Sequence, residues 1–212
     1  MTCIITFAAR SSAANATAAT AAVGKHSARF LMEKGAKVVG VADSKGTIVN
    51  PDGLDLDTLI SLKADGCSVI EYAEGQKLKR DAVVGVECDI WIPAARPDVV
   101  HGDNVGQMKT KLVVEGANIP FTYDAEKYLY ERGVIVVPDF IANTGGVICG
   151  AMEYQSMSQG AAMDVIAEKV HENTAQVLER AWREKITPRD AAVELATERV
   201  KRAMTTRRWS IF

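Results

Sequence analysis

Four short apolar runs, separated by segments with helical periodicity, constrain the fold of this chain more than any other feature. The runs lack the alternation of polar and apolar residues that marks a half-exposed strand, so each is expected to be a strand buried on both faces. Buried strands separated by helices of about ten residues are typical of a parallel sheet with crossover connections. The sequence therefore predicts an α/β fold with a doubly wound, mostly parallel sheet, whose strands lie at residues 37–43, 88–93, 111–115 and 134–138.

The segments between these runs carry the signals of helices and turns. Residues 23–31 place apolar or small side chains on one helical face, and Gly35 is expected to end this helix. Residues 56–63 and 122–132 have the same helical periodicity. The sequence Asn-Pro-Asp-Gly at 50–53 predicts a tight turn, because proline fixes φ and glycine accepts a positive φ.

After Gly146 the chain is predicted to be helical to its end. Apolar stripes predict helices over 160–184 and 187–205. Thr187 is expected to cap the second of these helices, with Pro188 as its first residue and Asp190 completing a variant of the capping box.

Residues 1–22 differ from the rest of the chain in composition. Nine of them are alanine, six are serine or threonine, and the one basic residue, Arg10, follows the apolar residues 3–7. A signal peptide needs basic residues before its apolar stretch and a transit peptide needs several arginines, so a targeting segment is not expected. Residues 3–7 are predicted to form a short strand. The tract that follows stays unassigned, because alanine favours a helix but apolar periodicity is absent.

Composition argues against several function classes. The 25 basic and 27 acidic residues give a net charge of −2, without the basic excess of a nucleic-acid binder. No uncharged apolar run reaches the roughly 18 residues that cross a bilayer, so a membrane protein is not expected. The four cysteines form no C-x-x-C pair and the three histidines lie far apart, which argues against a metal site. Scattered cysteines fit free thiols in a reducing cytoplasm, so a cytoplasmic location is expected.

A doubly wound sheet of the Rossmann-like class binds its ligands at the carboxyl ends of the strands. A dinucleotide-binding sheet of this class carries G-x-G-x-x-G directly before the first helix. At residues 19–24 only the last glycine, Gly24, is present after Val23, and Ala19 and Ala21 stand at the other two positions. A Cβ at the second position lies where a pyrophosphate must approach the backbone, so this segment alone is weak evidence.

Asp43 is a better candidate, because it ends a predicted strand 19 residues after Gly24. An acid that binds a ribose is expected about 20 residues after the glycines, and its charge repels a 2′-phosphate, which favours NAD over NADP. Lys45 weakens the expected preference for NAD, because its ammonium could reach a 2′-phosphate. The alternative is that Asp43 caps a helix or a turn together with Ser44.

Three further segments follow predicted strands or open helices and are rich in small residues and amides. Such residues suit close contact with a ribose or a nicotinamide, and ordinary turn chemistry is the alternative for each. The segments are Pro93-Ala94-Ala95, Glu115-Gly116-Ala117-Asn118 and Asn143-Thr144-Gly145-Gly146.

With these stretches in view, residues 24–212 resemble the cofactor domain of the glutamate/leucine/phenylalanine/valine dehydrogenase family. The resemblance covers nearly the whole chain after residue 23. The stretches that carry it are VGKHSARFLMEKGAKVVGVADSKGTIVNPDGLD, DIWIPAA, KLVVEGAN, ERGVIVVPDFIANTGGVICGAMEY and the closing RRWSIF.

The resemblance implies the NAD-binding domain of an amino-acid dehydrogenase, an enzyme that oxidatively deaminates an L-amino acid such as glutamate to a 2-oxo acid and ammonia. NAD is the implied cofactor and NADP the less expected one. The implied partners are the amino acid and the 2-oxo acid, and exposed apolar stripes on the C-terminal helices suggest self-association into a homo-oligomer. The expected parts are an atypical Ala-rich segment at 1–22, a dinucleotide-binding domain at 23–152 and a C-terminal helical segment at 153–212.

The resemblance also implies roles for single residues. Val23, Gly24, Asp43 and Ser44 would contact the cofactor, with Asp43 on the adenosine ribose. The resemblance puts Ala94 and Ala95 on the adenosine side, Asn118 near the nicotinamide ribose, Asn143 and Gly146 beside the nicotinamide, and Val147 and Gly150 near the substrate side chain. Glutamate-specific members carry serine where Gly150 stands, which leans weakly toward another substrate.

The sequence departs from the family pattern in two places. Family members carry a catalytic lysine in a K-G-G motif within an N-terminal domain, and this sequence has no K-G-G. No catalytic residue is therefore expected in this chain, and the isolated chain is expected to be inactive. Residues 1–22 replace the family's first cofactor strand and its G-x-G. The alternative function is a non-catalytic nucleotide-binding or interaction module derived from the family.

Overall fold

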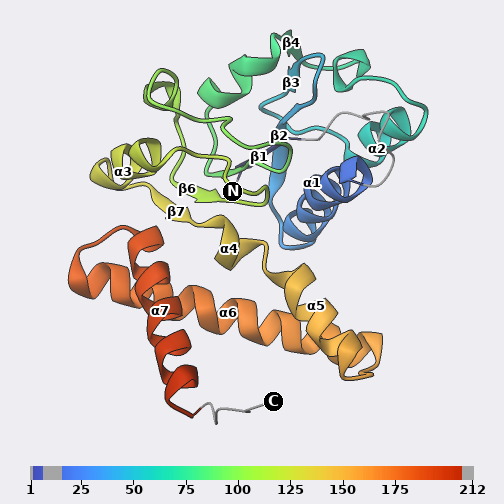
Figure 1. Ribbon diagram of the computed structural model, residues 1–212. Helices are drawn as coiled ribbons and strands as arrows, with labels where there is room; N and C mark the ends of the chain where they lie inside the picture. Colours follow the sequence, from blue (N-terminus) through green and yellow to red (C-terminus); the bar gives the residue numbers. More distant parts are fainter. Residues whose placement is uncertain (1, 7–15, 207–212) are drawn as a thin grey trace. The chain divides into compact units, whose positions relative to one another are not determined.

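The computed structural model describes the backbone of residues 2–6 and 16–206 and the side chains of residues 23–205. The chain forms two compact units, Met1–Asn143 and Thr144–Phe212 (Figure 1). The predicted dinucleotide-binding domain at 23–152 and helical segment at 153–212 stay a prediction. The compact units divide after Asn143, because the first helix of the second unit packs against the long helix that follows it.

The first unit is built on one sheet, with the strand order β4-β3-β2-β1-β5-β6-β7 among the described residues. Neighbouring strands from β2 through β1, β5 and β6 to β7 run parallel, whereas β3 and β4 are antiparallel additions at one edge. The prediction of an α/β fold with a mostly parallel sheet is confirmed. The strands are β1 Thr2–Thr6, β2 Lys37–Ala42, β3 Thr47–Val49, β4 Gln76–Leu78, β5 Ile90–Ile92, β6 Leu112–Val114 and β7 Ile135–Val137.

The N-terminal strand β1 lies in the middle of the sheet, between β2 and β5. It pairs in parallel with both neighbours, with Thr6 opposite Ala42 and Cys3 opposite Ile90. The sequence predicted a strand here and left its place undetermined. The segment with the atypical composition thus supplies the central strand of the sheet.

Helices of the first unit are α1 Ala16–Glu33, α2 Leu56–Ala64, α3 Tyr123–Glu131 and α4 Asp139–Ala142, with the 3-10 turns η1 Val69–Glu71, η2 Arg80–Gly85 and η3 Val105–Gln107. Helix α1 begins seven residues before the predicted start at residue 23, where the sequence is rich in alanine, the best helix former. It stops where expected, since Gly35 adopts φ +84° and its N–H donates to the carbonyl of Met32.

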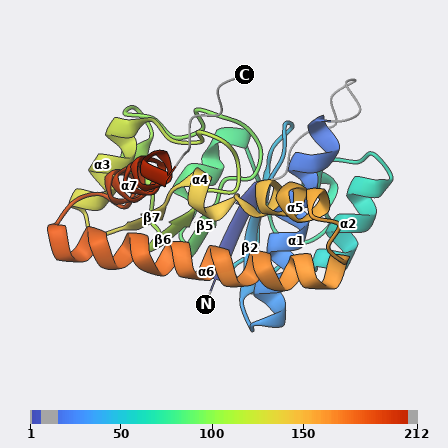
Figure 2. The same cartoon turned by 60° about the horizontal axis from the view of Figure 1, so that its bottom comes forward.

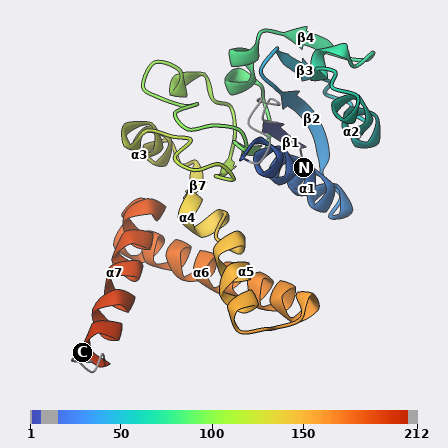
Figure 3. The same cartoon turned by 45° about the vertical axis from the view of Figure 1, so that its right-hand side comes forward.

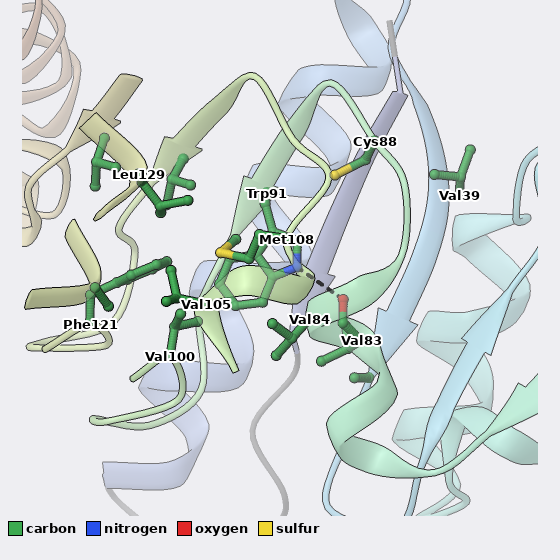
Figure 4. Close-up of a cluster of buried hydrophobic side chains, with 14 residues drawn as sticks. Val39, Val83, Val84, Cys88, Trp91, Val100, Val105, Met108, Phe121 and Leu129 are labelled. Carbon is green, nitrogen blue, oxygen red and sulfur yellow. Dashed lines mark hydrogen bonds between the residues drawn. The ribbon is translucent and has the colours of Figure 1, made fainter. Parts of the chain in front are cut away.

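Apolar side chains cover both faces of this sheet. On one face, α1, α2 and η1 pack over β2, β3 and β5, and α1 and α2 lie side by side next to β2 (Figure 3). On the other face, α3, η2 and η3 pack over alternate residues of β2, β5, β6 and β7 (Figure 4). Trp91 is the centre of this second cluster: its ring meets Phe121 edge-on at 5.9 Å, and its Nε1 donates to the Val83 carbonyl at 3.3 Å.

The second unit consists, among the described residues, of the helices α5 Gly145–Tyr154, α6 Gln159–Glu184 and α7 Pro188–Thr206. Helices α5 and α7 pack near opposite ends of α6 (Figure 2). The Arg180 guanidinium of α6 makes a bidentate pair with the Glu198 carboxylate of α7, at 2.8 and 2.9 Å. The predicted cap of α7 is confirmed, because the Thr187 hydroxyl accepts from the Asp190 N–H at 3.1 Å and donates to its carboxylate at 2.7 Å.

Strands β3 and β4 were not predicted from the sequence. Both have three residues, and β4 is polar and largely exposed, so neither shows a periodic pattern. Over the described ranges, no helix has the length and apolar character to cross a membrane. Within those same ranges, no three His, Cys, Asp or Glu side chains come together as a metal site.

Candidate cofactor site

The strand order places a topological switch point between β1 and β5. The chain leaves β1 toward β2 on one side of the sheet and returns to β5 on the other side of β1. In open α/β sheets, ligands bind outside the carboxyl ends of the strands at such a point. The relevant loops are therefore those that follow β1, β2, β5, β6 and β7.

The loops after β5 and β6 lie against each other and against α1. The Ala117 N–H donates to the Pro93 carbonyl at 2.7 Å. A Cβ on Gly116 would come within 2.9 Å of Val23 Cγ1, so only glycine permits this approach of the loop to the helix. Ala94 is fully buried and Ala95 is half-buried, so only Ala95 offers side-chain surface to a ligand.

Two predicted site residues from different loops form a direct pair. The Asn143 Nδ2 donates to the Asn118 Oδ1 at 2.7 Å, which joins the loop after β6 to the end of α4, the short helix after β7. Asn118 is exposed and Asn143 is half-buried. The sequence linked Asn118 and Asn143 only because both were predicted to lie on the nicotinamide side of a cofactor. In the structure their side chains are hydrogen-bonded to each other at the carboxyl ends of the strands.

Asp43 follows β2 as predicted, but its carboxylate is buried and fully engaged. Its exposed fraction is 4%, and five donors of this chain share the roughly four lone-pair positions of a carboxylate. A ribose hydroxyl would therefore have to displace one of these donors. The five donors are the N–H groups of Lys45 (2.9 Å), Gly46 (3.3 Å) and Val69 (3.1 Å), the Ser68 hydroxyl (3.0 Å) and the Lys63 ammonium (2.8 Å).

The bonds from Lys45 and Gly46 form the turn cap that the sequence offered as the alternative role for Asp43. Burial by itself raises the pKa of Asp43, and the hydrogen bonds from Lys63, Lys45 and Val69 outweigh it, so this pKa lies below its ordinary value. The carboxylate stays ionised near neutral pH. Ser44 and Lys45, the next two residues, are exposed and are the groups at the end of β2 that a ligand can reach.

The structure does not place Val23 and Gly24 in a phosphate-binding turn. Both lie inside α1, eight and nine residues into a helix that begins at Ala16, and Gly24 is buried. A turn that binds a pyrophosphate has to precede the helix, because the free N–H groups are those of the first turn. The connection from β1 to α1, residues 7–15, lies outside the described residues.

Gly146, Val147 and Gly150 belong to the second unit, where they lie within the first six residues of α5. Val147 is 78% exposed, and a Cβ on either glycine would meet no atom within 4 Å. Gly146 and Gly150 are four residues apart and so share one face of α5. In the second unit taken by itself, the space beside both glycines on this face is therefore empty.

Four residues that hold these loops were given no role of their own from the sequence. Lys63 and Ser68 bind Asp43, and the buried carboxylates of Glu115 and Asp139 bind the loops after β6 and β7. Glu115 ends a predicted strand and begins the candidate segment 115–118, and Asp139 directly follows a predicted strand, so the rule of carboxyl strand ends could have given both a role. Lys63 and Ser68 carry no such signal, because they lie 20 and 25 residues from Asp43 along the chain.

Residues 10–208 match the model of a family described as glutamate/leucine/phenylalanine/valine dehydrogenase. The chain is 38% identical over 198 residues to a glutamate dehydrogenase of Aeropyrum pernix, covering 88% of this chain and 47% of the relative. It is 41% identical over 198 residues to an NADP(+)-dependent glutamate dehydrogenase of Pyrobaculum calidifontis, with the same two coverages. The chain thus spans about half the length of the curated relatives that it matches.

Solved structures show the same likeness. A hetero-hexameric glutamate dehydrogenase of Thermus thermophilus, in a leucine-bound form, superposes with a TM-score of 0.79 at 27% identity, covering 95% of this chain and 46% of that one. An L-tryptophan dehydrogenase of Nostoc punctiforme superposes with a TM-score of 0.71 at 18% identity, covering 97% and 54%, which shows a shared fold.

Proposed function

Because the chain belongs to the glutamate/leucine/phenylalanine/valine dehydrogenase family, we propose that its first unit binds a nicotinamide dinucleotide for the oxidative deamination of an amino acid. The observation that carries the proposal is the pair of Asn143 and Asn118 beside the switch point of a parallel sheet. We assign the sheet to the doubly wound, Rossmann-like class, since both faces are covered and the strand order reverses at β1.

The residues at this edge fit such a cofactor. Ala95 and Gly116 are small enough for close approach of a ribose, and the exposed Asn118 amide offers donors to a ribose hydroxyl or to the nicotinamide carboxamide. A bound nicotinamide would supply the acceptor for the hydride that leaves the amino acid Cα. This chain's own residues bind and orient the cofactor. We assign the adenosine side to Ser44 and Ala95 and the nicotinamide side to Asn118, Asn143 and Gly146.

The choice between NAD and NADP, in this proposal, falls to exposed residues at the end of β2. A free Asp43 carboxylate would favour NAD, but this carboxylate has five donors of its own. Ser44 and Lys45 stand beside it, and an ammonium tolerates a 2′-phosphate. We therefore propose that the site accepts NAD and also NADP.

For the substrate, we propose an L-amino acid such as glutamate and its 2-oxo acid, with Val147 and Gly150 near the amino-acid side chain. The chain carries no K-G-G lysine, so we assign no catalytic residue to it and expect the isolated chain to bind cofactor without turnover. We further propose that the protein is cytoplasmic, self-associates, and binds neither nucleic acid nor membranes.

Calorimetric titration of the chain with NADH tests this proposal. Binding is expected, and Asn118→Ala should weaken it by about tenfold, the equivalent of a lost hydrogen-bonding pair. Asn50→Ala is the matched control, because the Asn50 amide caps a turn by accepting from Asp52 N–H.

Three other results would contradict the proposal or one of its assignments. Binding of NADH by Asn118→Ala as tightly as by the parent chain would refute the assigned site. An absence of binding to NADH and NADPH would leave the family-derived interaction module as the better description. Turnover of L-glutamate by the isolated chain, lost on substitution of one of its residues, would show that it does hold a catalytic group.

A further inference from the structure

Building on this cofactor site, we propose that Asp139 and Glu115 are positioning residues whose buried carboxylates hold the Asn118 amide in place for the nicotinamide half of the cofactor. Neither carboxylate reaches the open edge of the sheet, since their exposed fractions are 7% and 0%. Their effect on a ligand therefore has to pass through the residues they bind.

Asp139 binds the backbone beside both asparagines of the pair. Its Oδ2 accepts from the N–H of Ile119, the residue after Asn118, at 2.8 Å. Its backbone carbonyl accepts from the Asn143 N–H, also at 2.8 Å. One residue thus fixes the two chain segments whose side chains meet in the 2.7 Å bond between the amides.

Ile119 shows why this support is needed. Its φ is +49°, a left-handed conformation that is unfavourable for a β-branched residue. Its side chain is 61% exposed, so packing does not impose the conformation. Hydrogen bonds do, because its N–H donates to Asp139 and its carbonyl accepts from the Asp98 N–H at 2.9 Å. Without the Asp139 bond, the strained residue next to Asn118 loses one of its two restraints.

Glu115 in turn fixes Asp139. Its Oε2 accepts from the Asp139 N–H at 2.9 Å, and its own N–H donates to the Val137 carbonyl at 3.1 Å. These bonds tie the residue after β6 to the residues that end β7. The order of support therefore runs from Glu115 through Asp139 and Ile119 to Asn118, within the first unit.

The test compares NADH with ADP, which lacks the nicotinamide and the ribose that carries it. NADH reports on the whole site, whereas ADP reports on the adenosine side alone, so the ratio of their dissociation constants isolates the part that Asn118 contacts. Asp139→Ala should reduce the advantage of NADH over ADP by about tenfold and change the ADP constant less than about twofold. In an Asn118→Ala background, the same substitution should no longer change the ratio, because the effect passes through Asn118.

Asp139→Asn keeps the volume and one acceptor oxygen, so it should restore most of the ratio and provides the measurement if the alanine variant does not fold. Glu115→Ala, which removes the acceptor of the Asp139 N–H, should lower the ratio as Asp139→Ala does, and Glu115→Gln, which keeps an acceptor, should restore most of it. Asp55→Ala is the stability control: this carboxylate likewise accepts one backbone N–H, that of Thr58 at 2.7 Å, but it caps α2. The ratio of the two dissociation constants should not change in Asp55→Ala.

The outcomes separate this inference from the proposed function. If the parent chain binds both ligands and Asp139→Ala weakens both equally, or neither, the positioning role is overturned and the cofactor site stands. If the parent chain binds neither ligand, the proposed function is overturned and the inference falls with it. A ratio that drops in Asp139→Ala and recovers in Asp139→Asn supports the role.

Discussion

The Asp43 carboxylate and the Lys63 ammonium form an ion pair at 2.8 Å, with the aspartate side chain 1% exposed and the lysine side chain 25% exposed. The pair links the end of β2 to α2, and the Asp43 bonds to Ser68 and Val69 extend the link to η1. At the position where a ribose-binding acid was predicted, the chain thus uses its carboxylate to hold its own loops together.

Replacing this carboxylate should destabilise the protein. Asp43→Ala removes the acceptor of five donors and leaves Lys63 without its partner. The free energy of unfolding, measured with urea at pH 7, should therefore fall by about 2–4 kcal/mol. Asp52→Ala, at an exposed aspartate, is the control and should be nearly neutral. Equal stability of the two variants would refute a structural role for Asp43.

The same pair predicts a pH dependence with a defined sign. The pKa of Asp43 in the folded protein lies below the ordinary value of 3.8, because the hydrogen bonds outweigh burial. The stabilisation is therefore complete above about pH 4 and is lost as the pH falls through the lower pKa of the folded state. The stability difference between the parent chain and Asp43→Ala should accordingly shrink as the pH is lowered from about 4 through the lower pKa of the folded state. A difference that stays constant as the pH is lowered from about 4 would contradict the assignment.

Cofactor selectivity should respond to Lys45 and Glu71. Lys45→Ala should weaken NADPH binding about fivefold more than NADH binding, the size of an exposed charge interaction. The Glu71 carboxylate interacts electrostatically with Lys45, so Glu71→Gln should favour NADPH. Lys34→Ala, at an exposed lysine after α1, serves as the control. Titration of each variant with both reduced cofactors gives the ratios, and an unchanged ratio in Lys45→Ala would rule out this residue as the determinant.

Gly116 should not tolerate a side chain. Its Cβ would lie 2.9 Å from Val23 Cγ1 and 3.4 Å from the Pro93 carbonyl, and valine has little rotamer freedom to move aside. Gly116→Ala should cost about 1–3 kcal/mol in urea unfolding. Gly102→Ala, where a Cβ would meet nothing within 4 Å, is the matched control. Adding Val23→Ala should recover part of the loss, and a purely additive double variant would argue against the close approach.

Cys88 should be the least reactive of the three cysteines whose side chains the structure describes. Burial raises the pKa of its thiol to about 11, so about one molecule in a thousand carries the thiolate at pH 8. Cys67 and Cys149 are half-buried, and both should be alkylated before Cys88 in the native protein. Mass mapping after timed iodoacetamide treatment measures the order, with labelling in denaturant as the reference. Rapid native labelling of Cys88 would contradict its burial among the residues around Trp91 (Figure 4).

Local pattern was sufficient for most of the sheet. The four predicted runs contain β2, β5, β6 and β7, each within two residues of its predicted ends. Continuous apolarity over a few residues is enough to identify a strand that is buried on both faces. Pattern failed for β4, which is short and polar, and for the start of α1, where alanine gives helix propensity without periodicity.

The sequence by itself determined the parallel strands, the helix ends at Gly35 and Thr187, and the loops proposed to bind a ligand, because each depends on residues that are close neighbours in the chain. Only the tertiary structure decided what the side chains in those loops do. It joined Asn118 to Asn143 across 25 positions and Asp43 to Lys63 across 20. Donors and acceptors find their partners by folding, and a residue's own neighbours do not reveal which distant group will satisfy it.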